Sequence, residues 1–300
     1  MIGSMIGSLR AAWDRHWFEP EPALHLAVAR ILAAAVALWV VLSRDLAGVS
    51  GLAAEFWAGV ATSTRWRFLL FPGHESLERA LTAIAVLLLV GALVGIRPRT
   101  CAFGAALLLY HLAPLESIVW TASPYGRGLT LPTLTVLLCG IAPSGDALVR
   151  GAPSVRPSWI YGWPLRLIQF WLVSVYFFSG VAKLRASGLA WVAGGNLTHW
   201  LRLATQNELV AVHQTLGSWL AGNPMAAAAI GTGTLLFEFG SVVALASRRA
   251  RPWFAALAIA FHAGIYFAMN ISLNSWPLLL LFVDWQRISS GGGGLPAEQP

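Results

Sequence analysis

Charged residues are scarce in this 300-residue chain: they make up 11% of it, against about 25% in an average soluble domain. Hydrophobic residues make up 57%, and the mean hydropathy is +0.66. So few charges cannot cover the surface of a soluble protein of this length, which excludes a soluble enzyme and a disordered chain. The arginines that raise the pI to about 10.2 form no single basic patch, which excludes a nucleic-acid binder. We therefore predict a multi-pass membrane protein in the lipid bilayer.

Cysteine and the common catalytic motifs are also nearly absent. The two cysteines, Cys101 and Cys139, exclude a disulfide-stabilised scaffold, and we expect two buried thiols. The chain has no HExxH or CxxC metal motif, no phosphate-binding loop, no GxGxxG before a helix and no GxSxG. We therefore predict no metal site, and the chemistry must come from polar residues inside apolar helices.

A helix needs about 20 apolar residues to cross a bilayer, and seven runs have about this length. They are residues 22–42, 77–95, 101–119, 126–143, 163–183, 224–246 and 252–270. A shorter run, 272–284, is compatible with a half-helix, a re-entrant segment or a tilted last span. We predict an all-α integral membrane protein, a bundle of seven or eight transmembrane helices over residues 15–287. The ends, 1–14 and 288–300, are expected to be an N-terminal tail and a flexible Gly-rich tail.

Arginines in the short loops predict the orientation, because cytoplasmic loops carry an excess of basic residues. They gather before the first run, in alternate loops and after the last run, at Arg10, Arg15, Arg97, Arg99, Arg150, Arg156, Arg248, Arg249, Arg251 and Arg287. We expect a plasma-membrane protein with a cytoplasmic N-terminus and with the long loops 43–76 and 184–223 outside. Aromatic residues and leucine mix with polar residues over 53–70 and 196–220, which predicts amphipathic helices at the interface.

Polar residues gather on one face of the fifth run. Arg166, Gln169, Tyr176 and Lys183 recur at spacings of three and seven, and Gly180 lies among them. An ionisable residue inside a membrane is costly, so this stripe is a candidate site. The alternative is hydrogen bonding between helices, together with a lysine that reaches to the interface.

Lys183 is the only lysine among 20 basic residues. A composition this rich in alanine and arginine indicates a GC-rich, bacterial genome, in which arginine replaces lysine wherever either residue serves. A desolvated lysine can lose its proton and act as a base, whereas arginine stays protonated to about pH 12 and beyond. We therefore predict that Lys183 is catalytic.

The sixth run carries one carboxylate, Glu238, which needs a partner in an apolar helix. Arg166, Lys183 and His262 are the candidates, and a purely structural ion pair is the alternative. The predicted pocket-lining residues are Gln169, Tyr176, Gly180, Glu238 and the three that share a face of the seventh run, His262, Tyr266 and Asn270.

Other polar residues in the runs are predicted to be structural. The alternative to a pocket-lining role for His262 is that of a buried core histidine with satisfied hydrogen bonds. Arg30, in the first run, is expected to pair with a carboxylate or a lipid phosphate. His25 and His111 show no partner at a useful spacing.

Residues 166–195, RLIQFWLVSVYFFSGVAKLRASGLAWVAGG, resemble the signature of the HTTM (horizontally transferred transmembrane) family, the transmembrane domain of vitamin K-dependent gamma-carboxylases. The signature, R-x-x-Q, Y-F-x-x-G-x-x-K-L and W-x-x-G, is matched by Arg166, Gln169, Tyr176, Phe177, Gly180, Lys183, Leu184, Trp191 and Gly194. A weaker match covers residues 235–270, with Glu238, Arg249 and His262, and the first run resembles the family's first helix through Arg30. The resemblance covers most of residues 15–287. It implies that Arg30, Arg166, Trp191 and Gly194 are structural motif positions.

The resemblance also implies a mechanism. In the animal enzymes a lysine of this motif deprotonates reduced vitamin K, and the quinol anion reacts with oxygen to give a strong base. That base removes a proton from a glutamate, and carbon dioxide then adds. Lys183 matches this lysine, so the implied cofactor is reduced menaquinone or vitamin K, bound at an outward-facing pocket.

Two departures argue against peptide gamma-carboxylation itself. The animal enzymes carry a large soluble region after the helices, and their lysine is assisted by a histidine that would fall at 121–127, where TASPYGR has none. We therefore expect a quinol- or lipid-dependent enzyme with Lys183 as its base. One alternative is a membrane component for the maturation or export of a secreted toxin or peptide, bound at the outer loops, without redox chemistry of its own. A lesser alternative, a transporter or channel, would need inverted repeats and paired broken helices.

Overall fold

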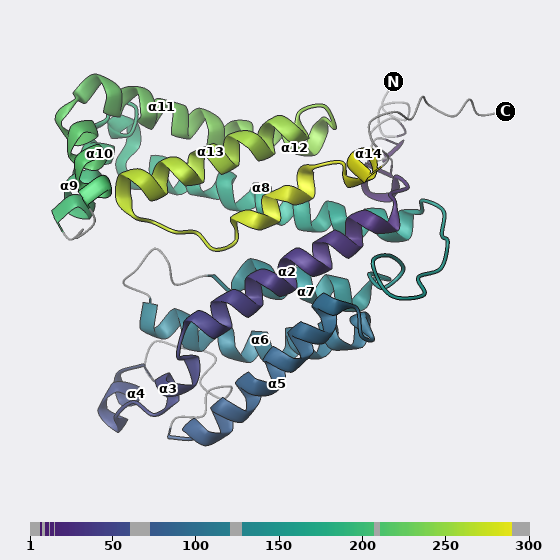
Figure 1. Cartoon of the computed structure of the whole chain (residues 1–300). Coiled ribbons are helices and arrows are strands. Elements are labelled where there is room, and N and C mark those ends of the chain that lie inside the picture. The colour runs from purple at the N-terminus through teal and green to yellow at the C-terminus, as the bar shows by residue number, and fades with distance from the viewer. Residues whose placement is uncertain are drawn as a thin grey trace. The chain divides into compact units, whose positions relative to one another are not determined.

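The computed structural model describes residues 16–60, 73–120, 128–206 and 211–289, together with residues 7, 10, 11, 13 and 14. Helices dominate the described residues (Figure 1). In chain order they are α2 (Ala23–Ser43), α3 (Leu46–Ser50), α4 (Ala54–Val60), α5 (Glu75–Val94), α6 (Pro98–Trp120), α7 (Thr130–Ile141), α8 (Trp159–Ser187), η2 (Gly188–Ala190), α9 (Gly195–Gln206), α10 (Ala211–Gly222), α11 (Pro224–Gly240), α12 (Val243–Ala246), α13 (Arg251–Met269), η3 (Trp276–Phe282) and α14 (Trp285–Ser289). The described part contains no β-strand, only an isolated bridge between Glu21 and Ser158. The all-α prediction is confirmed.

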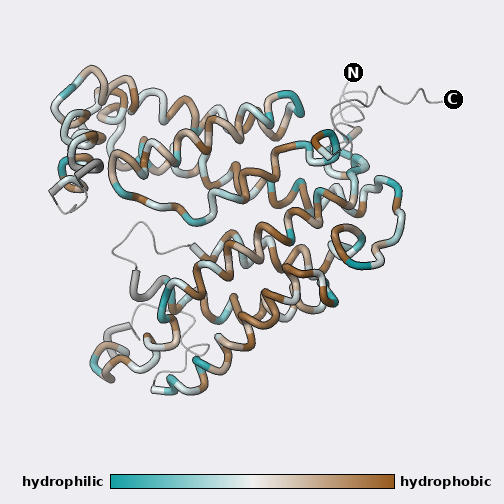
Figure 2. Tube along the Cα trace, viewed as in Figure 1, coloured by the Kyte–Doolittle hydropathy of each residue, from teal (hydrophilic) through white to brown (hydrophobic). Residues whose placement is uncertain are grey.

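Five of the described helices are long and apolar enough to cross a membrane. They span Ala23–Ser43, Glu75–Val94, Trp159–Ala190, Pro224–Ala246 and Arg251–Met269. Hydrophobic residues line these helices, and hydrophilic residues lie mostly in the connections (Figure 2). The chain is therefore a multi-pass membrane protein. The predicted number of seven or eight spans is not established, because the remaining apolar runs form α6, the shorter apolar helix α7 and the segment η3.

The last apolar run, 272–284, does not form a continuous α-helix. Its helical part is η3, a 3₁₀ helix of seven residues. At 2.0 Å per residue it rises about 14 Å, roughly half of the 30 Å hydrocarbon core. Among the predicted alternatives this geometry matches a half-helix, and η3 packs along α13.

Local sequence signals explain the ends of the helices in the second half of the chain. The Asn223 side chain accepts a hydrogen bond from the backbone N–H of Ala226 at 3.1 Å, and Pro224 begins α11. Both residues are preferred at a helix N-terminus. The asparagine side chain accepts from a backbone N–H group that has no partner within the helix, and proline has no N–H group that would need one. Helix α13 ends at Met269, and its cap residue Asn270 takes the left-handed conformation (φ 52°), which asparagine tolerates better than most residues.

The chain divides into two compact units. One comprises Met1–Ile168 and Asp284–Pro300, and the other Gln169–Val283. In the first, α2 packs against α5 and α7, and α6 packs against α5 and α7. Small residues allow this: Ala33 and Ala37 of α2 are fully buried. A Cβ atom on Gly140 of α7 would lie 2.6 Å from the backbone nitrogen of Phe103 in α6, so the two backbones are in close contact.

In the second unit, α9 and α10 form the predicted amphipathic segment of the loop 184–223. Leu197 and Leu201 of α9 are buried in an apolar cluster with α10 and the end of α13, whereas Trp200 and Leu203 are exposed. Residues 207–210 of this segment lie outside the described residues. In the other long loop, α4 occupies the first part of the predicted segment 53–70, and the residues of that segment from 61 onward lie outside the described residues as well.

Glu116 is the centre of a buried polar cluster in the first unit. Its carboxylate pairs with Arg44 and accepts hydrogen bonds from the backbone N–H groups of Gly128 and Leu129 at 3.0 and 2.9 Å. Glu116 is 1% exposed. Burial lowers the pKa of Arg44, which lies just after α2, so the carboxylate is needed to hold the guanidinium charge.

We expect Glu116→Ala to destabilise the protein strongly. The substitution leaves buried donors without their acceptor, and removing one partner of a buried ion pair costs about 3–5 kcal/mol. Thermal unfolding of the purified protein in detergent measures the effect.

Glu75→Ala is the matched control. The pair of Glu75 with Arg79 lies at the surface, with side chains 44% and 58% exposed, and exposed pairs contribute about 0–1 kcal/mol. Equal losses of stability in the two variants would contradict the role assigned to Glu116.

Candidate functional site

The site is built where α8 passes α11 within the second unit. A Cβ atom on Gly180 would lie 3.2 Å from the ring of Phe239 and 3.3 Å from the Cβ of Glu238. A side chain at this position would have to displace those atoms, so glycine lets the two helices approach. Lys183 lies one helical turn after Gly180, which brings it to Glu238.

Lys183 and Glu238 form an ion pair between the Nζ atom and Oε1. The lysine side chain is 22% exposed and the glutamate side chain 2%. The second carboxylate oxygen, Oε2, is buried and has no hydrogen-bond partner among the described residues. The Lys183 Nζ also lies 5.4 Å from the centre of the Trp191 ring, a cation–π distance. Of the predicted partners of Glu238, the structure selects Lys183.

A second polar pair joins α8 to α13. The Tyr176 hydroxyl and Nε2 of His262 are 2.6 Å apart, and Nδ1 of His262 is buried without a partner among the described residues. The tyrosine ring has edge contacts with Phe237 at 5.2 Å and Phe254 at 5.6 Å. This pair is therefore enclosed by aromatic rings, an environment that favours neutral groups.

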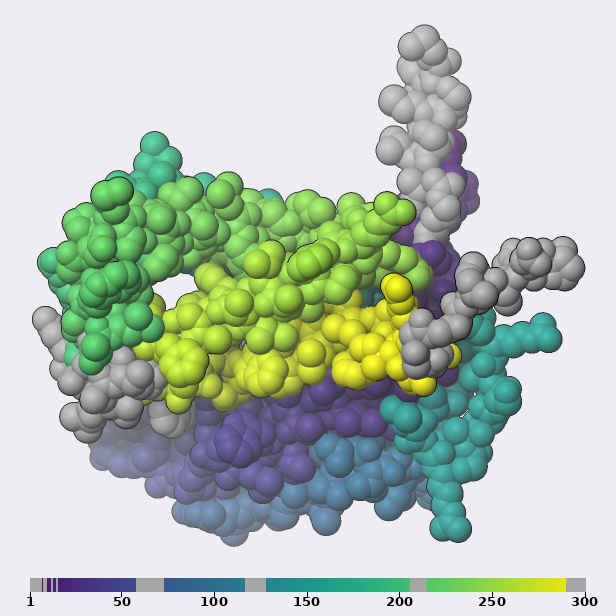
Figure 3. Space-filling view, turned by 45° about the horizontal axis from the view of Figure 1, so that its top comes forward, coloured from purple at the N-terminus to yellow at the C-terminus, as the bar shows by residue number. Residues whose placement is uncertain are grey.

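Five predicted residues thus come together on three helices: Tyr176, Gly180 and Lys183 on α8, Glu238 on α11 and His262 on α13. An opening in this unit is bordered by α9 and α10, by α11 and by α13 with the segment that follows it (Figure 3). The Lys183–Glu238 pair can therefore hold a proton between an amine and a carboxylate inside an apolar enclosure.

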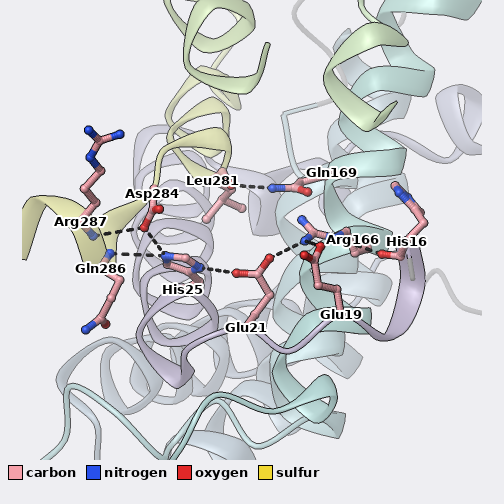
Figure 4. A network of polar contacts seen from close by, with 10 residues as sticks. All are labelled: His16, Glu19, Glu21, His25, Arg166, Gln169, Leu281, Asp284, Gln286 and Arg287. Atoms are coloured by element: carbon pink, nitrogen blue, oxygen red, sulfur yellow. Dashed lines mark hydrogen bonds and ion pairs between the residues drawn. The ribbon is translucent and has the colours of Figure 1, made fainter. Parts of the chain in front are cut away.

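The other three predicted lining residues have different places. Gln169 donates from its side-chain nitrogen to the carbonyl of Leu281 at 2.8 Å, which holds η3 against α8 (Figure 4). Tyr266 is 42% exposed. Asn270 caps the end of α13.

Arg166 belongs to a separate cluster in the first unit. Its guanidinium pairs with Glu21 and donates to Glu19 at 3.4 Å and to the carbonyl of His16 at 3.2 Å (Figure 4). This anchors the start of α8 to the chain before α2. The stripe predicted on the fifth run therefore divides: Arg166 serves the structural alternative, while Lys183 lies in the candidate site.

Arg30 does not have the expected partner. It is 1% exposed, and its guanidinium donates to the backbone carbonyls of Ser144 and Leu148, the second at 3.2 Å. These carbonyls follow the end of α7, where helical chain lacks internal donors. Carbonyls at a helix end therefore take the place of the expected carboxylate, since a buried arginine can also satisfy such carbonyls.

The prediction that His25 has no partner at a useful spacing was wrong, and His111 has a partner far away in the sequence. His25 lies 2.9 Å from Glu21 and 3.4 Å from Asp284 (Figure 4). Its pairing with Glu21 has a sequence signal, because residues four apart meet at a helix start. His111 lies 2.9 Å from Glu78 on another helix, and no sequence spacing indicates that contact.

No group of three or more potential metal-ligating side chains occurs within the part of the chain that the structure describes. The position of the assisting histidine, 121–127, lies outside that part.

Comparison with known proteins identifies the family. No curated protein and no solved structure gives a significant match. The model of the HTTM domain matches residues 18–285, which is most of the chain. The match includes the whole polar stripe of α8 as well as Glu238 and His262. The chain therefore belongs to the HTTM domain family.

Proposed function

We propose that this protein is a carboxylase-like membrane enzyme that uses Lys183 as a base on a quinol- or lipid-borne substrate. The observation that carries the proposal is the ion pair of the only lysine with a buried glutamate. Family membership supports it, because the signature that this chain matches contains the lysine of the vitamin K-dependent gamma-carboxylases.

The Lys183–Glu238 pair can exchange one proton without a change in net charge. When the proton moves from the Lys183 Nζ to the Glu238 carboxylate, a neutral amine faces the site and no charge is left unpaired. A neutral amine can then accept a proton from an acidic hydroxyl. The resulting ammonium then lies beside the neutral carboxylic acid of Glu238 and stabilises the anion left on the hydroxyl oxygen, an interaction that is strong in a medium of low dielectric constant.

The residues present fit a quinol. The Glu238 Oε2 atom is a buried acceptor with no partner among the described residues, as a hydroxyl-bearing ligand requires. Phe237 and Phe254 supply apolar rings beside Tyr176, against which an aromatic ring can pack. A bound reduced menaquinone or vitamin K would supply the hydroxyl proton. Tyr176 and His262 orient each other through their hydrogen bond.

We expect Lys183→Ala and Lys183→Arg to abolish turnover while both variants insert normally. Arginine keeps the positive charge but cannot release its proton, and a lost general base lowers the rate by about 100-fold or more. The assay uses protein in lipid nanodiscs with reduced menaquinone, oxygen and bicarbonate, and detects quinone epoxide by mass spectrometry.

Full turnover by a correctly inserted Lys183→Arg variant would overturn the proposal. Absence of turnover in the wild-type protein would do the same. It would favour the alternative role in the maturation or export of a secreted toxin or peptide.

The charge of Lys183 can be measured without turnover, because the chain contains no other lysine. We expect Glu238→Gln to increase the rate at which an amine-reactive reagent labels Lys183 at pH 7. The carboxylate stabilises the unreactive ammonium, so its removal favours the neutral amine by about tenfold or more. Peptide mass spectrometry measures the rate against the N-terminal amine. A labelling rate equal to that of the wild type would show that Glu238 does not control the lysine.

We also propose a plasma-membrane location, with the N-terminus cytoplasmic and the loops 43–76 and 184–223 outside. The distribution of arginines supports this orientation. The exposure of Trp200 and Trp219 on α9 and α10 supports a position of these helices at a membrane interface, which tryptophan favours.

Two single-cysteine variants test the orientation, in a background with serine at the two natural cysteines. Gly222→Cys is expected to react with a membrane-impermeant maleimide on intact cells, because an added Cβ atom there meets nothing within 4 Å and the loop is outside. Ser154→Cys, at an exposed position of a loop predicted to be inside, should react only after lysis. The reverse pattern would refute the orientation.

A further inference from the structure

The segment Gly188–Gly195 connects α8 to α9, and we call it the strap. It lies against α11 through direct backbone contact. Gly194 has a φ of +77°, and a Cβ atom there would lie 2.6 Å from the backbone nitrogen of Ala228. A Cβ atom on Gly231 would collide with the carbonyl oxygen of Trp191. The strap is therefore placed by the absence of side chains on both sides of the contact.

Further contacts hold the strap in this position. The Thr232 hydroxyl donates to the carbonyl of Val192 at 3.5 Å. The Gly194 N–H donates to the carbonyl of Trp191 at 3.2 Å, which closes a tight turn. Trp191 also packs against the buried apolar cluster that includes Leu197 and Leu201. The backbone at Trp191 is thus tied to α11, and its side chain packs against α9.

This placement determines what surrounds the only lysine of the chain. The Trp191 ring lies 5.4 Å from the Lys183 Nζ, while the Glu238 carboxylate pairs with the same atom. A carboxylate and an aromatic face both stabilise an ammonium ion. Neither group stabilises the neutral amine to the same extent.

We propose that the strap is a positioning device: Trp191 and Glu238 together hold Lys183 as an ammonium ion. The contact of the strap with Gly231 therefore determines how readily the neutral amine of Lys183 forms. Its functional meaning rests on the proposed role of Lys183 as a base. Trp191 acts through the lysine and is a positioning residue.

Labelling of Lys183 by an amine-reactive reagent tests the device in the full-length protein in nanodiscs. Gly231→Ala moves the strap but leaves the Trp191 ring intact. Gly233→Ala is its matched control on the same helix, because a Cβ atom there meets nothing within 4 Å. Trp191→Leu removes the ring, and Trp191→Phe replaces it with a weaker cation–π partner. Each rate is measured at pH 7 and at pH 10 relative to the N-terminal amine.

We expect Gly231→Ala and Trp191→Leu to label about two- to tenfold faster at pH 7, with a smaller increase at pH 10, where less of the amine is protonated. Trp191→Phe should lie between Trp191→Leu and the wild type, and Gly233→Ala should match the wild type. The ratio of the two rates reports the charge of the amine, whereas a ring that only covered the lysine would change both rates equally.

An equal increase at both pH values would overturn the proposal, as would wild-type labelling in both Gly231→Ala and Trp191→Leu. The measurement needs neither quinol nor turnover. Altered labelling without any quinol turnover would therefore refute the proposed enzyme and leave the strap in place. Loss of turnover in Lys183→Arg, with unchanged labelling in the strap variants, would support the proposed enzyme and refute the role of the strap.

Discussion

A charge buried in a bundle of apolar helices is tolerated only when another group neutralises or solvates it, and the polar architecture of this protein follows from that constraint. Lys183 has Glu238, and Arg166 has Glu21. Arg30 instead donates to backbone carbonyls beyond the end of α7. Each of these contacts joins segments far apart in the sequence, so satisfying the charge also fixes the packing.

The same constraint separates the structural pairs from the candidate site. Arg166 and Arg30 use a side chain that stays protonated, and their partners hold elements together. At the candidate site the cation is a lysine, which can give up its proton, and the carboxylate retains an unused oxygen. Small residues allow these close contacts. Gly180 lets Glu238 approach α8, and Gly231 lets the strap, which contains Trp191, pack against α11.

The fold class and the core of the candidate site could be predicted from the sequence for physical reasons. Hydropathy predicts membrane helices because lipid accepts only helical or closed-barrel backbones. Helical periodicity placed Tyr176, Gly180 and Lys183 on one face, and the structure keeps them together. The rest of the stripe has other partners: Gln169 bonds the Leu281 carbonyl and Arg166 pairs with Glu21, because a long helix passes different neighbours along its length. The pair His25–Glu21 was detectable from a spacing of four, but it was missed.

The sequence by itself determined that this is an α-helical, multi-pass membrane protein with a single lysine, because composition and run length depend on no contact between distant residues. Only the tertiary structure decided which partner each buried polar residue has. The pairs Lys183–Glu238 and Tyr176–His262 join residues 55 and 86 positions apart, and the Trp191 ring reaches Lys183 because the strap rests on α11. Such pairings depend on how closely helices approach, and that distance is set by the small residues between them.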